Sequence, residues 1–181
     1  MKPPEIVEAG DVVLERWGPR WVAEATAAVR ESLPELKQFL AWATDDYGDE
    51  TAREYGEHSA ASWAEGTEFN YAILSPDGRL AGSVGLMTRM GPGVLEIGYW
   101  LRTSCTGRGY MTAAVDALAR IALTLPGIER VAIRHDAANL RSAAVARRAG
   151  FAEVGRRRRV PDAPGGTDTE VIRERRATPE G

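Results

Sequence analysis

The chain has 181 residues, of which 44% are hydrophobic and 27% are charged, as expected for one globular domain with a sizeable core. Its single cysteine, Cys105, excludes a disulfide framework within the chain and suits a reducing compartment, so we expect a cytoplasmic protein. The two histidines are too few for a protein zinc site, and no metal is expected. The N-terminus has no apolar run, so we expect neither a signal peptide nor a membrane span.

Charge is distributed unevenly around a formal net value of −3. Residues 1–70 hold 15 acids and 6 bases, whereas residues 130–181 hold 12 bases and 7 acids. This asymmetry predicts different partners on two sides of the protein. The run from Arg156 to Arg159 continues a strand-like segment, so alternate arginines face opposite sides and no nucleic-acid partner is expected.

The first third of the chain predicts one short strand and three helices. The strand covers Val12 to Glu15, and the first helix covers Pro19 to Ser32. Pro34 opens a second helix, with Leu36, Phe39, Leu40 and Ala43 in phase. A polar acidic loop from Thr44 to Thr51 precedes the third helix, which stops at Gly66.

The rest of the chain predicts strands alternating with two helices. A hairpin with a Ser-Pro-Asp-Gly turn opens this part. The expected strands are Phe69–Leu74, Leu80–Thr88, Val94–Arg102, a segment around Val131 and Ile133, Phe151–Val160 and Thr169–Arg176; the helices run from about Met111 to Leu125 and from Asn139 to Gly150. We therefore predict a single α+β domain over residues 1–181, with a mostly antiparallel sheet flanked by helices and a frayed tail at 177–181.

The loop after Val94–Arg102 is the most informative segment. Gly107 and Gly109 adopt backbone angles closed to other residues, and the helix that follows leaves its first amides unpaired. Such a loop is typical of a phosphate site. A dinucleotide-binding loop needs a third glycine where Thr112 stands, although Glu129 lies at the distance expected for its acidic residue. No Gly-Lys-Ser/Thr follows for a Walker loop, and a tight turn without ligand is the remaining alternative.

The stretch Glu-Ile-Gly-Tyr-Trp-Leu followed by Gly-Arg-Gly-Tyr-Met-Thr resembles the acyl-CoA signature of the GNAT N-acetyltransferases, and more narrowly the RimJ/RimL branch, which acetylates protein N-termini. Thr106 departs from the family's Arg or Gln at that position. The resemblance implies that the backbone holds the coenzyme A pyrophosphate at Gly107, Arg108, Gly109, Tyr110, Met111 and Thr112. It also implies that Leu101, Arg102 and Thr103 pair with the pantetheine arm as an added strand.

A second block, from Asn139 through Ser142 to Gly150 and Phe151, resembles the family's Asn-x-x-Ser helix. Many relatives place a proton-donating tyrosine seven residues after the asparagine, where this chain has Ala146. The resemblance therefore implies Ser142 as the donor to the leaving sulfur and Asn139 as a cofactor contact. From the residues alone, Ser142 is equally a first-turn helix residue and Asn139 an N-cap.

A base that removes the proton of the amine is less clearly indicated. Glu96 lies on the strand before the glycine loop and is the first candidate; Glu68 and His135 are weaker ones. Cys105 has no context for a nucleophile. The resemblance implies an acetyl-CoA-dependent N-acetyltransferase acting on a primary amine, foremost a ribosomal or other protein N-terminus. A polyamine or aminoglycoside acetyltransferase and a non-catalytic acyl-CoA-binding module remain alternatives, as do a monomer and a homodimer.

Overall fold

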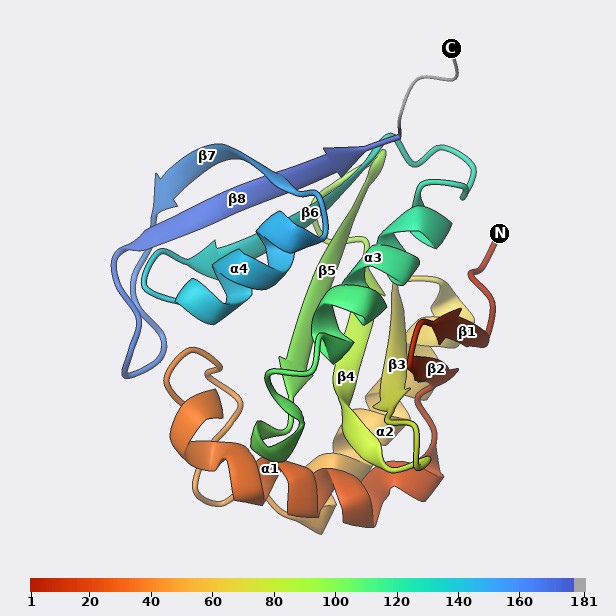
Figure 1. Ribbon diagram of the computed structural model, residues 1–181, viewed down its shortest axis with the longest axis vertical. Coiled ribbons are helices and arrows are strands. Elements are labelled where there is room, and N and C mark those ends of the chain that lie inside the picture. The colour runs from red at the N-terminus through yellow and green to blue at the C-terminus, as the bar shows by residue number, and fades with distance from the viewer. Residues whose placement is uncertain (178–181) are drawn as a thin grey trace.

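A computed structural model describes residues 1–177 as one mixed sheet of eight strands with helices on both faces (Figure 1). The sheet order is β1-β2-β3-β4-β5-β6-β8-β7. The strands are β1 (Ile6–Ala9), β2 (Val12–Arg16), β3 (Glu68–Leu74), β4 (Leu80–Met87), β5 (Val94–Leu101), β6 (Arg130–Asp136), β7 (Ala152–Arg158) and β8 (Thr169–Arg176). The helices are α1 (Val22–Leu36), α2 (Asp49–Glu65), α3 (Tyr110–Ala122) and α4 (Leu140–Arg148), with short 3-10 turns η1 (Pro19–Trp21) and η2 (Thr103–Cys105).

Two apolar cores lie on opposite faces of the sheet. Helices α3 and α4 lie on the near face in Figure 1, where Leu118 of α3 packs with strand residues such as Ile97 and Ile133. On the other face, α1 and the segment after it pack Trp21, Val29 and their neighbours over β3 and β4. The predicted α+β class and mostly antiparallel sheet are confirmed, because within residues 1–177 only β5 and β6 pair in parallel.

The parallel pair is also where the sheet opens. β5 and β6 pair at only three positions, the last of which joins Glu96 to Ala132. Beyond it β5 runs on to Leu101 and β6 to Asp136, and the two strands diverge (Figure 1). We call this divergence the splay. A strand edge that leaves its neighbour keeps unpaired backbone groups, so it offers hydrogen bonds to another extended chain.

The sequence analysis differs from the structure at two places near the N-terminus. Strand β1 was not predicted, because four residues paired only with β2 give little pattern. The helix predicted to open at Pro34 is wrong: Pro34 lies inside the last turn of α1, and turns follow Leu36. Pro34 has no N–H to donate to Arg30 O, so α1 lacks that hydrogen bond two residues before it ends. Of the predicted tail, residues 178–181 lie outside the described part.

Candidate functional site

The glycine loop opens α3 in the predicted way. Gly107 and Gly109 both have φ of +76°, and a Cβ added at either would meet no atom within 4 Å. Ala113 is the first residue of this helix whose amide donates to a backbone oxygen, that of Gly109, at 3.1 Å. Within residues 1–177, the amides of residues 107–112 have no acceptor of their own. Open space before six free amides and a helix N-terminus fits a pyrophosphate.

The edge of β5 on the splay carries the backbone groups for an extended ligand. The Arg102 amide donates to Ala81 O at 2.7 Å, which places the polar backbone groups of that residue toward β4. The backbone N–H and C=O groups of successive residues point to alternate sides of an antiparallel strand. Those that point toward the splay therefore belong to Leu101, Tyr99 and Ile97. The sequence analysis identified Leu101 only; counting back by two along the strand would have found Tyr99 and Ile97.

Arg102 and Thr103 do not extend this edge, so that part of the prediction is corrected. The Arg102 side chain is buried, with Nε 2.8 Å from Glu31 Oε2. The Thr103 amide donates to Ser32 Oγ at 2.9 Å. Both residues thus fasten the start of the loop to α1, and their backbone groups are used inside the protein.

Asn139, Ser142 and Tyr99 form a connected polar group across the splay. Asn139 caps α4, because its Oδ1 accepts the Ser142 amide at 3.1 Å. The Tyr99 hydroxyl oxygen lies 2.7 Å from Ser142 Oγ and 3.1 Å from Ser142 O, so its one hydrogen can go to either acceptor. Burial raises the pKa of the Tyr99 hydroxyl to about 12, so it stays protonated at neutral pH. Ser142 thus lies in the first turn of α4 and contacts β5 through Tyr99, a partner that the sequence analysis missed.

Glu96 is buried at the last β5–β6 pair, between two guanidinium groups. Its oxygens accept from Arg89 at 2.6 and 2.9 Å and from Arg134 at 2.7 and 3.0 Å. Burial by itself raises the pKa of Glu96, but the hydrogen bonds from both arginines outweigh burial and hold the pKa below its ordinary value. A carboxylate with all its acceptor sites filled is a weak proton acceptor, which weighs against direct base catalysis by Glu96.

The two weaker base candidates are also engaged. His135 Nε2 accepts from Arg173 Nε at 3.1 Å, so its Nδ1 donates to Asp136 O at 2.8 Å. Burial and the charge of Arg173 lower the pKa of His135, which favours a neutral structural ring. Glu68 Oε2 lies 3.1 Å from His58 Nε2 and also accepts from Asn70 Nδ2 at 3.4 Å.

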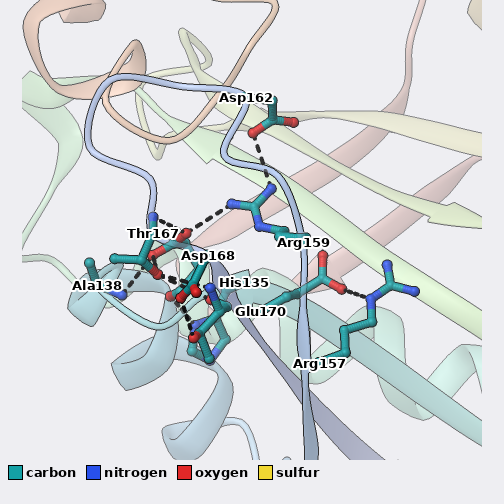
Figure 2. Close-up of polar contacts among 10 residues, drawn as sticks. His135, Ala138, Arg157, Arg159, Asp162, Thr167, Asp168 and Glu170 are labelled. Atoms are coloured by element: carbon teal, nitrogen blue, oxygen red, sulfur yellow. Dashed lines mark hydrogen bonds and ion pairs between the residues drawn. The ribbon is translucent and has the colours of Figure 1, made fainter.

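The loop between β7 and β8 is fastened to Asp136 at the end of β6, and Figure 2 shows the loop residues Arg159 and Thr167 near Ala138. The buried Asp136 carboxylate accepts from the amides of Ala138 and Thr167, from Thr167 Oγ1 and from Arg159 Nη2, at 2.7–2.9 Å. Farther along this loop, the Gly165 amide donates to Gln38 O at 2.8 Å. The loop thereby joins the end of β6 to the segment that follows α1.

The arginine run on β7 is matched by acids of the same chain. Arg156 pairs with Glu153 at 2.7 Å, Arg157 with Glu170, Arg158 with Asp168 at 2.6 Å and Arg159 with Asp136 at 2.9 Å. Most of these pairs lie on the surface of the two-stranded β7–β8 ribbon. The run is therefore part of the architecture of this ribbon.

The segment between α1 and α2 combines exposed acids with an exposed aromatic ring. Trp42 is 42% exposed and makes an edge contact with Trp100 of β5, with ring centroids 6.0 Å apart. Asp45, whose side chain is 85% exposed, lies 3.6 Å from Lys37. The predicted acidic loop thus lies at the surface. The Trp42 ring connects this segment to Trp100, which follows Tyr99 on β5.

These features define an acyl-CoA-dependent transferase fold: a strand–glycine loop–helix unit next to a parallel pair that splays. The sequence matches the acetyltransferase (GNAT) domain family over residues 11–152. The chain therefore belongs to the GNAT acetyltransferases and is an enzyme that uses acetyl-CoA as its acetyl donor. A comparison with curated protein sequences finds no significant match.

Solved structures with the same fold support the assignment. RimL, a ribosomal L7/L12 α-N-protein acetyltransferase in complex with coenzyme A, has a TM-score of 0.86 and 23% identity, over 95% of this chain and 98% of that one. Mycobacterium smegmatis RimJ has a TM-score of 0.86 and 22% identity, over 98% and 90%. The microcin C7 self-immunity acetyltransferase MccE, in complex with acetyl-CoA and AMP, has a TM-score of 0.85 and 20% identity, over 93% of both chains.

Two further observations concern residues 1–177 only. None of the helices in this part has the length and apolar character needed to cross a membrane. In the same residues, no three His, Cys, Asp or Glu side chains come together as a metal site would require.

Proposed function

We propose that this acetyltransferase acts on protein N-terminal α-amines, in the manner of the RimJ/RimL branch. The observation that carries the proposal is the splay, with an open glycine loop after the diverging end of β5 and the Ser142–Tyr99 pair across it. The RimL and RimJ structures, with their similar folds, support this acceptor class. A ribosomal acceptor would place the protein in the cytoplasm.

The cofactor assignment follows from the free backbone groups. The six amides from Gly107 to Thr112 would hold the pyrophosphate, and the β5 edge at Ile97, Tyr99 and Leu101 would pair with the pantetheine arm. Beside the loop, Arg79 and Arg108 line a cavity of about 500 Å³ and add positive charge. Acetyl-CoA supplies a thioester whose carbonyl carbon accepts the amine.

Ser142 is the proposed hydrogen-bond donor to the leaving sulfur. The amine nitrogen forms a bond to the carbonyl carbon, the carbon–sulfur bond breaks, and its electron pair stays on sulfur. The proton lost by the nitrogen ends on the sulfur, so Ser142 is unchanged by the reaction. Glu96 is not the proposed base, because its four hydrogen bonds from Arg89 and Arg134 leave no free acceptor site for the amine or for a bridging water.

One alternative is tested with the main proposal. A small-molecule amine acetyltransferase is favoured by the similarity to MccE, whose structure contains AMP. Release of free thiol from acetyl-CoA separates the two acceptor classes when N-terminal peptides, polyamines and aminoglycosides are compared. Peptide-dependent release supports the proposal, and release with small amines alone favours the alternative.

A further inference from the structure

Tyr99 and Ser142 come from elements that the splay separates, yet their side chains meet. Tyr99 lies on β5 beyond the last β5–β6 pair, and Ser142 lies in the first turn of α4. Their hydroxyl oxygens are 2.7 Å apart, an ordinary hydrogen-bond distance between two hydroxyl groups. The contact thus brings two proton-bearing groups together where the reacting end of an extended ligand on the β5 edge would lie.

A count of hydrogens distinguishes two arrangements. The Ser142 amide is already used by Asn139, and Tyr99 has one hydrogen to give to either Ser142 O or Ser142 Oγ. If the Tyr99 hydrogen goes to the carbonyl oxygen, the Ser142 hydroxyl hydrogen points at the Tyr99 oxygen and cannot be donated to the ligand. If it goes to Oγ, the Ser142 hydrogen is free to point into the splay.

We propose that Tyr99 is a positioning residue for acetyl transfer, which donates to Ser142 Oγ and so directs the Ser142 hydrogen at the leaving sulfur. The proposal rests on the proposed function of this site. A serine hydroxyl is a poor acid, but a hydroxyl that receives a hydrogen bond becomes a stronger donor. The Tyr99 ring is packed against the core of the α3 and α4 face, so the pair is oriented before the ligand binds. Tyr99 would thus compensate for the absence of a tyrosine at Ala146.

The test compares Tyr99→Phe, Ser142→Ala and the double variant. We expect Ser142→Ala to lower kcat by about 10²-fold, as loss of one donor at a developing charge does. Tyr99→Phe should lower kcat by about tenfold. In the Ser142→Ala background, Tyr99→Phe should have no further effect, because its partner is already gone. The affinity for acetyl-CoA should change by less than about threefold in all three.

The control is Tyr71→Phe, which removes another buried phenol hydroxyl, one that donates to Pro4 O at 2.7 Å outside the site. It should leave kcat unchanged. A second readout needs no turnover: the thiol of bound coenzyme A is titrated by the ultraviolet absorbance of its thiolate. A donor at sulfur lowers the thiol pKa, so Ser142→Ala and Tyr99→Phe should both raise it.

The outcomes separate this proposal from the proposed function. If no amine supports turnover but both variants raise the pKa of the bound thiol, the function is wrong and the positioning role stands. If Tyr99→Phe lowers kcat by the same factor with and without Ser142, or leaves the thiol pKa unchanged, Tyr99 does not act through Ser142 and the proposal is overturned.

Discussion

Glu96 is a buried carboxylate that holds the point where the sheet opens. Its side chain is 4% exposed, and its partners come from the β4–β5 connection (Arg89) and from β6 (Arg134). Because Glu96 belongs to the last β5–β6 pair, the two arginines fix both strands where they diverge. We infer that its main contribution is structural: it sets the origin of the splay.

We therefore predict that Glu96→Gln lowers stability more than activity. Removing one member of a buried ion pair leaves the others uncompensated, and the free energy of unfolding should fall by about 3 kcal/mol. Urea unfolding measures this change, while kcat at saturating amine should fall less than about tenfold. The matched control is Glu5→Gln, which removes an exposed pair with Arg16 and should cost less than about 1 kcal/mol. A stable variant whose kcat falls by 10²-fold or more would instead assign proton transfer to Glu96.

At the scale of the element, the glycine loop predicts a specific loss of cofactor binding. Gly109→Val puts a branched side chain at φ +76°, into space that the structure leaves open for phosphate. Affinity for acetyl-CoA should fall more than tenfold, which corresponds to about 1.4 kcal/mol. Gly127→Val is the control, because Gly127 has φ of +77° and equally open surroundings after the other end of α3. Gly127→Val should lower the free energy of unfolding by a similar amount and leave the affinity for acetyl-CoA unchanged. If both variants bind acetyl-CoA equally well, the phosphates lie elsewhere.

The segment between α1 and α2 predicts electrostatic recruitment of a cationic amine. Asp45 and Asp46 are exposed, and Trp42 beside them offers a ring face for a cation. Rising salt should raise KM for the amine, because charges in water are screened over about 8 Å at physiological ionic strength. Since the attacking amine must be neutral, the rate should also increase with pH until deprotonation is complete.

Neutralising Asp45 and Asp46 together to asparagine should raise KM and weaken its salt dependence, with little effect on kcat. Glu54→Gln with Glu57→Gln makes the same charge change on exposed positions of α2 and should leave KM nearly constant. A KM that does not respond to salt, or a preference for acidic peptides, would contradict recruitment by this segment.

Local patterns account for what was predictable at the element scale. The glycine loop, the Asn139 cap and the apolar face of α3 each depend on residues within one turn, so the sequence alone indicates them. The splay depends on where β5 and β6 stop pairing, and the partners of Glu96 lie 7 and 38 residues away. Tyr99 meets Ser142 across 43 residues. Such contacts are set by register and packing, which have no local sequence pattern.

At the scale of the whole molecule, the connection between β6 and the β7–β8 loop determines how the fold responds to acid. His135 is buried and neutral, and Asp136 next to it fastens the loop to β6. Burial alone raises the pKa of Asp136, but hydrogen bonds from two amides and from Arg159 outweigh it and lower the pKa below 3.8. The pKa of His135 is lowered from 6.5, mainly by burial.

We predict that acid destabilises the protein in two phases. Below pH 6.5 the unfolded chain binds a proton at His135 that the folded chain resists, so stability falls as pH falls toward the lowered pKa. Below about pH 4.5, Glu96 and Asp136 stay ionised in the fold while their unfolded forms bind protons, so stability falls again as pH approaches their lowered pKa values.

Urea midpoints measured across this range should be flat above pH 7. His135→Asn, whose amide can still donate to Asp136 O, should remove the first phase only. A first phase that persists in His135→Asn would show that another group resists protonation in the fold.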